Sequence, residues 1–110
     1  MILLIHSKAS PADVAVMMEA LKDYVKVAVD IHKGILAGGG VMHADCEARL
    51  IEAGSQQKDI WGADWYPRDK TVGFGSLINI RPRQNNLSME IKDSKVRGDV
   101  EKIIRVLLEI

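Results

Sequence analysis

Apolar residues recur along the chain with two different periods, and each change of period predicts where strands and helices lie. Residues 2–5 form a short continuous apolar run, which is typical of a strand buried inside a sheet. Residues 60–66 and 72–80 each alternate between two faces, so each segment predicts a further strand. Pro67 and Pro82 follow these segments and end them, because proline cannot donate to a sheet ladder.

A long amphipathic helix is predicted after the first strand. Ser10 is a favourable N-cap and Pro11 fits the first helical turn. From Val14 to Ile35 the apolar residues are spaced three and four apart, as on one face of a helix. The run Gly38-Gly39-Gly40 would then end this helix.

Residues 42–52 fit two interpretations. Their content of Ala, Glu, Arg and Leu favours a helix. Their alternation favours a strand, with Met42, Ala44, Cys46, Ala48 and Leu50 on one face and His43, Asp45, Glu47 and Arg49 on the other. We prefer the strand, because the alternation is regular and Ala53-Gly54-Ser55 resembles a hairpin loop.

The chain is predicted to end in a second helix. Asp93 or Ser94 would cap it, after a polar loop over residues 83–92. Its buried stripe would consist of Val96, Val100, Ile103, Leu107 and Ile110, with Ile104 and Leu108 alongside. The predicted order is β-α-β-β-β-α, a two-layer α+β domain with both helices on one face of a mostly antiparallel sheet.

Composition agrees with one ordinary domain, since 110 residues with 47% hydrophobic and 27% charged residues can bury one core. Fifteen basic and fifteen acidic residues leave no net charge, which makes nucleic acid an improbable partner and leaves little repulsion between two copies. No segment has the roughly 20 apolar residues of a membrane span. The start of the chain also lacks a signal-peptide pattern, so we expect a cytoplasmic protein without a membrane partner.

If residues 42–52 are a strand, polar side chains gather on the open face of the sheet. The candidate ligand-binding residues are His43, Asp45, Glu47, Trp61, Asn79 and Arg81. A tryptophan pair, or else Tyr66 with Asp64, must join them on that face. Such a mixture can bind a small polar or anionic ligand, although a shift of one residue in register would reverse the faces.

His43, Asp45 and Glu47 would offer one nitrogen and two oxygens on alternate positions of a strand, as metal ligands can. A solvated or salt-bridged polar face has the same pattern, and we favour that interpretation. No metal or other cofactor is therefore expected. Cys46 would point into the core, where a cysteine behaves as a small hydrophobic residue.

Three segments carry a resemblance to a known family: His43-Ala44-Asp45, the sequence GSQQKDIWG at residues 54–62, and SLINIRP at residues 76–82. In these motifs the chain from Asp30 onward resembles a small prokaryotic family of unknown function. The resemblance implies a stand-alone cytoplasmic protein. It carries no activity, substrate or catalytic residue.

Three functional hypotheses follow from the sequence. The favoured one is a non-enzymatic binding or interaction module that forms a homodimer, because the charge is neutral, the apolar stripe of the first helix is broad and aromatic residues are expected on the surface. The second is a small metal-assisted hydrolase that uses His43, Asp45 and Glu47, with Arg81 as an anion clamp. The third is a regulatory protein associated with nucleic acid through Arg81, Arg83 and Lys95.

Overall fold

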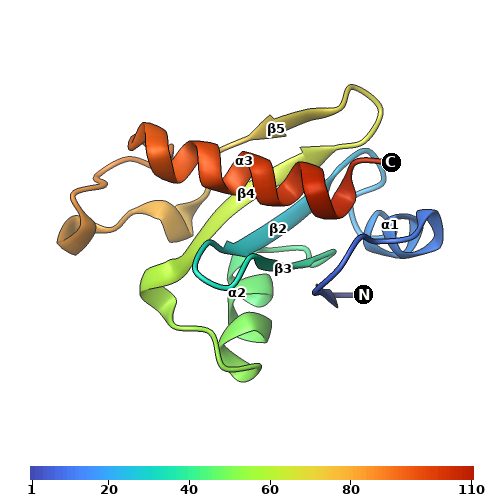
Figure 1. The fold of residues 1–110 in the computed structure, drawn as a ribbon, viewed down its shortest axis with the longest axis horizontal. Helices are drawn as coiled ribbons and strands as arrows, with labels where there is room; N and C mark the ends of the chain where they lie inside the picture. The colour runs from blue at the N-terminus through green and yellow to red at the C-terminus, as the bar shows by residue number, and fades with distance from the viewer.

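The computed structural model describes all 110 residues and contains one five-stranded antiparallel sheet (Figure 1). The strands are β1 (Leu3–Ile5), β2 (Val25–Asp30), β3 (Ile35–Gly38), β4 (Ile60–Tyr66) and β5 (Thr71–Gly73), in the spatial order β1-β3-β2-β4-β5. The helices are α1 (Pro11–Met17), α2 (His43–Glu52) and α3 (Ser94–Leu108). Three single 3-10 turns lie at Gln57–Asp59, Leu77–Asn79 and Pro82–Gln84. The α+β class is confirmed, whereas the predicted element order is wrong.

The long N-terminal helix is the first correction. Ser10 and Asp13 do form a capping box, but α1 is only seven residues long. The chain then enters the sheet as the β2–β3 hairpin, in which Val25, Val27 and Val29 alternate and are fully buried. Only Val25 continues the predicted helical stripe, and the β-branched side chains favour a strand because they pack well on a pleated surface.

The β2–β3 turn and the three glycines complete this correction. The carboxylate of Asp30 accepts the backbone N–H groups of His32 and Lys33, both at 2.9 Å. Gly34 has φ +71°, which glycine adopts at no steric cost. Gly38 ends β3 rather than a helix, and a Cβ on it would lie 2.9 Å from the side chain of Val27.

The segment predicted as a strand at residues 42–52 is helix α2, so this prediction is also wrong. Cys46 and Leu50 are four residues apart, and both are fully buried against Ala28, Ala37 and Ile60 of the sheet. Every second residue of this segment was apolar or small, a pattern that a helix with a narrow buried stripe also satisfies.

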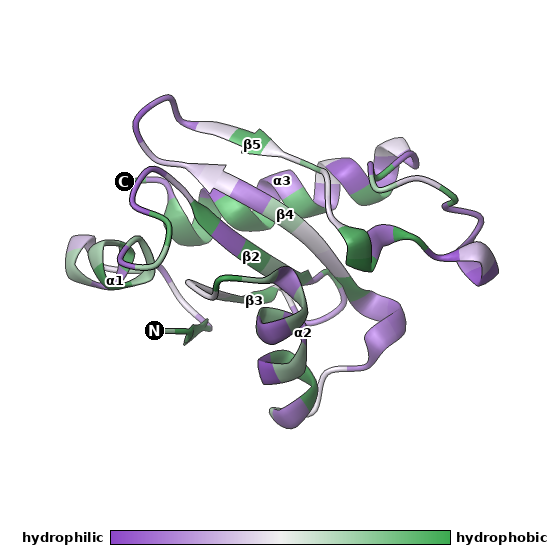
Figure 2. Ribbon diagram, turned by 180° about the vertical axis from the view of Figure 1, so that it is seen from behind, coloured by the Kyte–Doolittle hydropathy of each residue, from purple (hydrophilic) through white to green (hydrophobic).

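Helices cover both faces of the sheet, so the structure has three layers and the predicted two-layer arrangement is wrong. α1 and α3 pack on one face, against Val25, Val27 and Val29 of β2. Trp61, Ala63 and Trp65 of β4 share that face, as their alternation predicted. α2 lies on the opposite face, where it stands in front of β2 and β3 in Figure 2.

The last third of the chain is partly as predicted. α3 begins after Asp93, whose carboxylate accepts the N–H groups of Lys95 and Val96 at 2.8 and 3.0 Å. Its buried residues are Val100, Ile104, Leu107 and Leu108, whereas Ile110 is exposed. The strand predicted at residues 72–80 is only β5, because the chain leaves the sheet after Gly73 and forms an irregular segment beside β4.

Candidate functional site

Because residues 43–52 are helical, the polar residues predicted for one strand face point in different directions. His43 opens α2 and packs against β4, with only 10% of its side chain exposed. Asp45 is exposed to solvent, and Glu47 lies 3.4 Å from the guanidinium of Arg81. No three His, Cys, Asp or Glu side chains come close enough together to hold a metal ion. The ligand set suggested by His43, Asp45 and Glu47 is therefore not assembled.

Arg81 has a structural role in this arrangement. A guanidinium has five N–H groups, and the protein supplies five acceptors for them. They are the carbonyls of Gln57, Ile60 and Ile78, the amide of Gln84 and the carboxylate of Glu47, at 2.6 to 3.4 Å. Burial lowers the pKa of Arg81, and Glu47 partly opposes that shift. The guanidinium also lies over the ring of Trp61, at 5.1 Å from its centroid. No donor of Arg81 is left for an anion.

Asn79 is fully buried and replaces a missing strand beside β4. Its Oδ1 accepts the N–H of Gly62 at 2.7 Å, and its Nδ2 donates to the carbonyl of the same residue at 2.9 Å. Nδ2 also donates to the carbonyls of Phe74 and Met89, both at 3.1 Å. The two bonds to Gly62 satisfy backbone groups that would otherwise be buried without partners, whereas the carbonyls of Phe74 and Met89 also accept backbone N–H groups. Asn79 therefore holds the irregular segment on the sheet and does not face a ligand.

His43 forms the best-defined polar pair on the α2 face of the sheet. Its Nε2 lies 2.9 Å from Oδ1 of Asp64 and 3.0 Å from the carbonyl oxygen of Ala63. Because both partners are acceptors, Nε2 carries a proton. The only buried side-chain nitrogens or oxygens without a partner are the indole nitrogens of Trp61 and Trp65, so the unpartnered Nδ1 of His43 is open to solvent.

His43 and Asp64 line a cleft of about 380 Å³ between the start of α2, β4 and the segment after β5. Lys26 of β2 lines it too, and its Nζ donates to the carbonyl of Val41 at 3.1 Å. Two N–H donors of the ammonium remain open. Ser76 supplies a hydroxyl whose Oγ accepts the N–H of Ile78 at 3.3 Å. The side chains of His43, Lys26 and Asp64 are thus held by the protein and keep capacity for one more partner, whereas Ser76 is only 5% exposed and its hydroxyl lies against Gly62.

The rest of the cleft is apolar and unusually exposed. Met42, Leu77 and Met89 line it with 50%, 67% and 49% of their surface open to solvent. Ala44 and Ile78 complete the apolar wall. The cleft therefore combines polar side chains with large hydrophobic side chains that the fold leaves uncovered.

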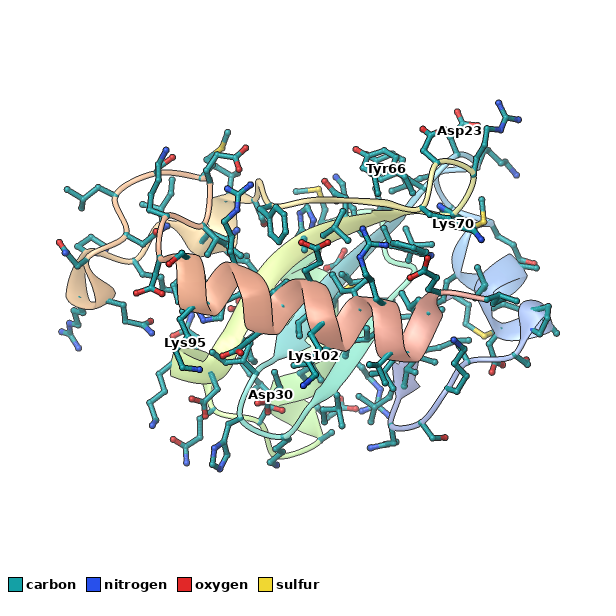
Figure 3. All side chains as sticks on the ribbon, turned by 45° about the horizontal axis from the view of Figure 1, so that its top comes forward. Asp23, Asp30, Tyr66, Lys70, Lys95 and Lys102 are labelled. Carbon is teal, nitrogen blue, oxygen red and sulfur yellow. The ribbon has the colours of Figure 1, made fainter.

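Two tyrosines lie on the sheet beside Asp64. The rings of Tyr24 and Tyr66 stack with their centroids 5.1 Å apart and their planes at 11°. Burial raises the pKa of Tyr66, and the charge of Asp64 and the neighbouring Tyr24 add to that shift. Tyr66 lies near the β4–β5 turn, at the opposite end of the sheet from Asp30 (Figure 3). The negative charge of Asp64 therefore reaches Tyr66 at this end of the sheet.

Two other clefts are less suited to specific binding. One of about 450 Å³ is lined by Gln57, Lys58, Ile80, Arg81, Pro82, Arg83 and Gln84. Although it is larger, its central arginine has no open donor, and Lys58 and Arg83 are surface cations. A cleft of about 340 Å³ lies between residues 84–86 and the start of α3, where Asp93 already caps the helix. We therefore take the cleft at His43 and Asp64 as the candidate site.

The fold and this cleft define the class of protein: a three-layer α+β domain with an amphipathic cleft on the thinner side of its sheet. The chain belongs to the family described as protein of unknown function DUF5674, whose model matches residues 3–107. No curated protein and no solved structure is similar enough to the chain to match it. None of the helices has the length and apolar character needed to cross a membrane.

The sequence analysis singled out two of the polar residues that line this cleft and missed two others. His43 was a candidate, and Asp64 was considered for the open face. Lys26 and Ser76 were missed, because Lys26 was placed in the long helix and Ser76 in a strand. One signal was available for Lys26: it is the only charged residue between Val25 and Val29, so a strand there exposes a cation on the face away from the valines.

Proposed function

We propose that this domain is a non-enzymatic binding module that holds a small amphipathic ligand in the cleft at His43 and Asp64. One observation carries the proposal: three polar groups with open hydrogen-bonding capacity stand beside exposed methionine and leucine side chains. These groups are Nδ1 of His43, the ammonium of Lys26 and the carboxylate of Asp64. Small-molecule sites combine an apolar lining with a few placed polar groups in this way.

The size of the cleft supports the same proposal. Its volume of about 380 Å³ lies within the range of roughly 300–1,000 Å³ that small-molecule sites occupy. An apolar ligand group would cover Met42, Leu77 and Met89, which the isolated chain leaves in water. Removing such surface from water stabilises a complex by about 25 cal/mol for each Å² buried.

The two other hypotheses from the sequence gain less support from the contacts. The metal-assisted hydrolase required His43, Asp45 and Glu47 to converge, and Asp45 points into solvent. The nucleic-acid hypothesis relied on Arg81, Arg83 and Lys95, of which only Arg83 is an exposed cation without an acidic partner. Every donor of Arg81 is used within the protein, and Lys95 pairs with Asp99 at 3.1 Å.

A screen of small polar and amphipathic compounds by thermal shift tests the binding proposal. The informative variant is Leu77→Asp, which places a charge in the apolar wall. Leu87→Asp is its matched control, since Leu87 is a similarly exposed leucine outside the cleft, 75% exposed against 67% for Leu77. We expect a compound that stabilises the wild type and Leu87→Asp but not Leu77→Asp. Compounds that act equally on all three proteins would contradict the proposal.

A homodimer is a second proposal, and the exposed apolar rim of the cleft favours it. Val41, Met42, Leu77 and Met89 are each about half exposed or more, and the net charge of zero adds no long-range repulsion. Sedimentation velocity at high micromolar concentration should show a dimer that Leu77→Asp dissociates. A monomer under those conditions would remove this proposal without affecting the cleft.

We also propose that this is a cytoplasmic protein of a prokaryote. The single cysteine is a free, buried thiol, which suits a reducing compartment. Fractionation of cells that express the tagged chain would test this location. Recovery from a secreted or membrane fraction would contradict it.

A further inference from the structure

We infer that the ligand is a zwitterion with an apolar side chain, of the class of the hydrophobic α-amino acids. The inference rests on the proposed function, because it names the ligand class of the same cleft. It is argued from the charges in the cleft, from how they are held, and from the apolar wall opposite them.

The cleft offers one positive and one negative side chain. Lys26 contributes an ammonium and Asp64 a carboxylate, while His43 and Ser76 are the other polar side chains of the lining. A simple anion would gain the attraction of Lys26 but meet the charge of Asp64, and a simple cation would meet the reverse. A zwitterion is complementary to both groups, and such complementarity is what selects one partner over another.

The two charges lie opposite each other on neighbouring strands but do not neutralise each other. Lys26 and Asp64 are direct cross-strand partners in the antiparallel β2–β4 ladder. Opposite charges in that position ordinarily pair, yet no ion pair joins them here. The carbonyl of Val41 holds the ammonium, and Nε2 of His43 holds Oδ1 of the carboxylate. Two N–H donors and the second carboxylate oxygen are left open to a ligand.

An α-amino acid carries its ammonium and carboxylate on one carbon, so it can present opposite charges to two neighbouring side chains at once. Its ammonium would donate to Oδ2 of Asp64, which accepts no hydrogen bond within the protein. Its carboxylate would accept from the two open N–H donors of Lys26. His43 acts as a positioning residue, since it orients Asp64 through Nε2.

The apolar wall then selects among amino acids. Met42, Leu77 and Met89 lie on the same cleft, and two of them are methionines. Methionine is unbranched and polarisable, so it adapts to apolar groups of different shape. We therefore expect leucine, methionine and phenylalanine to bind, and glycine and serine to bind much more weakly because they cover little of this wall.

Isothermal titration calorimetry with three related compounds tests the charge argument. L-leucine carries both charges, isocaproate is the same skeleton without the ammonium, and isoamylamine is the skeleton without the carboxylate. Each is titrated into the wild type, Lys26→Met and Asp64→Asn, after circular dichroism has confirmed that the variants are folded. If a variant does not fold, the comparison of the three compounds on the wild type still decides.

We expect leucine to bind the wild type about tenfold to a hundredfold more tightly than either single-charge analogue, which is the usual effect of one charged hydrogen bond. Asp64→Asn should weaken leucine by a similar factor and leave isocaproate unchanged or improved. Lys26→Met should weaken leucine and leave isoamylamine unchanged or improved.

Equal or tighter binding of isocaproate or isoamylamine to the wild type would overturn the inference. If none of the three binds while another compound shows the Leu77→Asp effect, the inference is wrong and the proposed function stands. If no compound of the screen responds to Leu77→Asp, both are wrong.

Discussion

The two faces of the sheet are built very differently. On the face covered by α1 and α3, 17 buried residues form one continuous core. On the face covered by α2, the buried cluster has five residues. α2 covers the part of the sheet around Ala28, Ala37 and Ile60 and leaves Lys26 and Asp64 accessible from one side.

This difference separates stability from binding. The thick face contains the tryptophans of β4 and the buried residues of α3, so it supplies most of the apolar burial that stabilises the fold. The thinner face can therefore leave Met42, Leu77 and Met89 in water, at a cost that the rest of the core offsets. Substitutions on the two faces should consequently have opposite profiles: large losses of stability on one, and losses of binding with little change in stability on the other.

The largest effect should come from Trp65→Ala on the thick face. Trp65 is 1% exposed and packs under α3, so its removal leaves a cavity. We expect the free energy of unfolding to fall by about 3–5 kcal/mol. Urea denaturation followed by circular dichroism measures it. A loss below about 1 kcal/mol would show that the two faces do not differ as described.

Asn79→Ala should have the next largest effect, because it removes one side chain that makes four hydrogen bonds. The N–H and carbonyl of Gly62 would stay buried without a partner, and we expect a loss of about 3 kcal/mol. Leu87→Ser, in the same irregular segment but exposed, is the control and should change stability little. Equal stability of the two variants would remove the structural role assigned to Asn79.

A smaller effect is expected from pH through Cys46. Burial is the main cause that raises the pKa of its thiol above the ordinary value, and the charge of Asp45 adds to it. The unfolded chain therefore loses this proton first as the pH rises. The stability that the protonated thiol contributes is complete below the ordinary pKa and is lost as the pH climbs through the folded value.

Thermal melts of the wild type and Cys46→Ala across the alkaline range measure this contribution. The melting temperature of the wild type should fall more steeply than that of the variant, in which the thiol is absent. Parallel curves would contradict the shift. The same burial predicts that iodoacetamide reacts slowly with the folded protein, because the thiolate is the reactive form.

The smallest change in stability is expected for Leu77→Ser in the cleft. Leu77 is 67% exposed, so its substitution should alter the free energy of unfolding by no more than about 0.5 kcal/mol. The same variant should lose ligand binding, as Leu77→Asp does. A large loss of stability would mean that Leu77 belongs to the core, which would weaken the contrast between the faces.

The sequence correctly predicted those elements whose residue pattern fits only one kind of secondary structure. The alternation of β4 was clear because Trp61 and Trp65 fall on one face, and the cap of α3 was clear because Asp93 precedes a regular stripe. The strand at residues 25–30 was missed because Val25 and Ala28 continued the helical spacing of Leu21, although Val27 and Val29 lay outside that stripe. The strand predicted at residues 42–52 was wrong for the converse reason, since an alternation of small residues also fits a helix with a narrow buried stripe.

The candidate site could not be predicted in full because the secondary structure of both segments was assigned wrongly. With His43 on a strand, its neighbours Asp45 and Glu47 would have shared its face. On a helix it instead reaches β4 and meets Asp64, a contact between residues that are 21 positions apart. Such a contact follows from the packing of α2 on the sheet, which residue patterns alone do not specify. Arg81 and Asn79 were predicted as ligand-binding residues, but their hydrogen bonds are to other groups of the protein itself.

The most direct test of the central claim, that the thinner face of the sheet binds a ligand, is the titration of isotope-labelled protein with L-leucine, followed by amide chemical shifts in NMR spectra. We predict that the largest shifts occur at Lys26, His43, Asp64 and residues 75–77, with the amides of α3 unaffected. Shifts centred on α3 or on residues 80–84, or no saturable shifts with leucine or any compound of the screen, would contradict the claim.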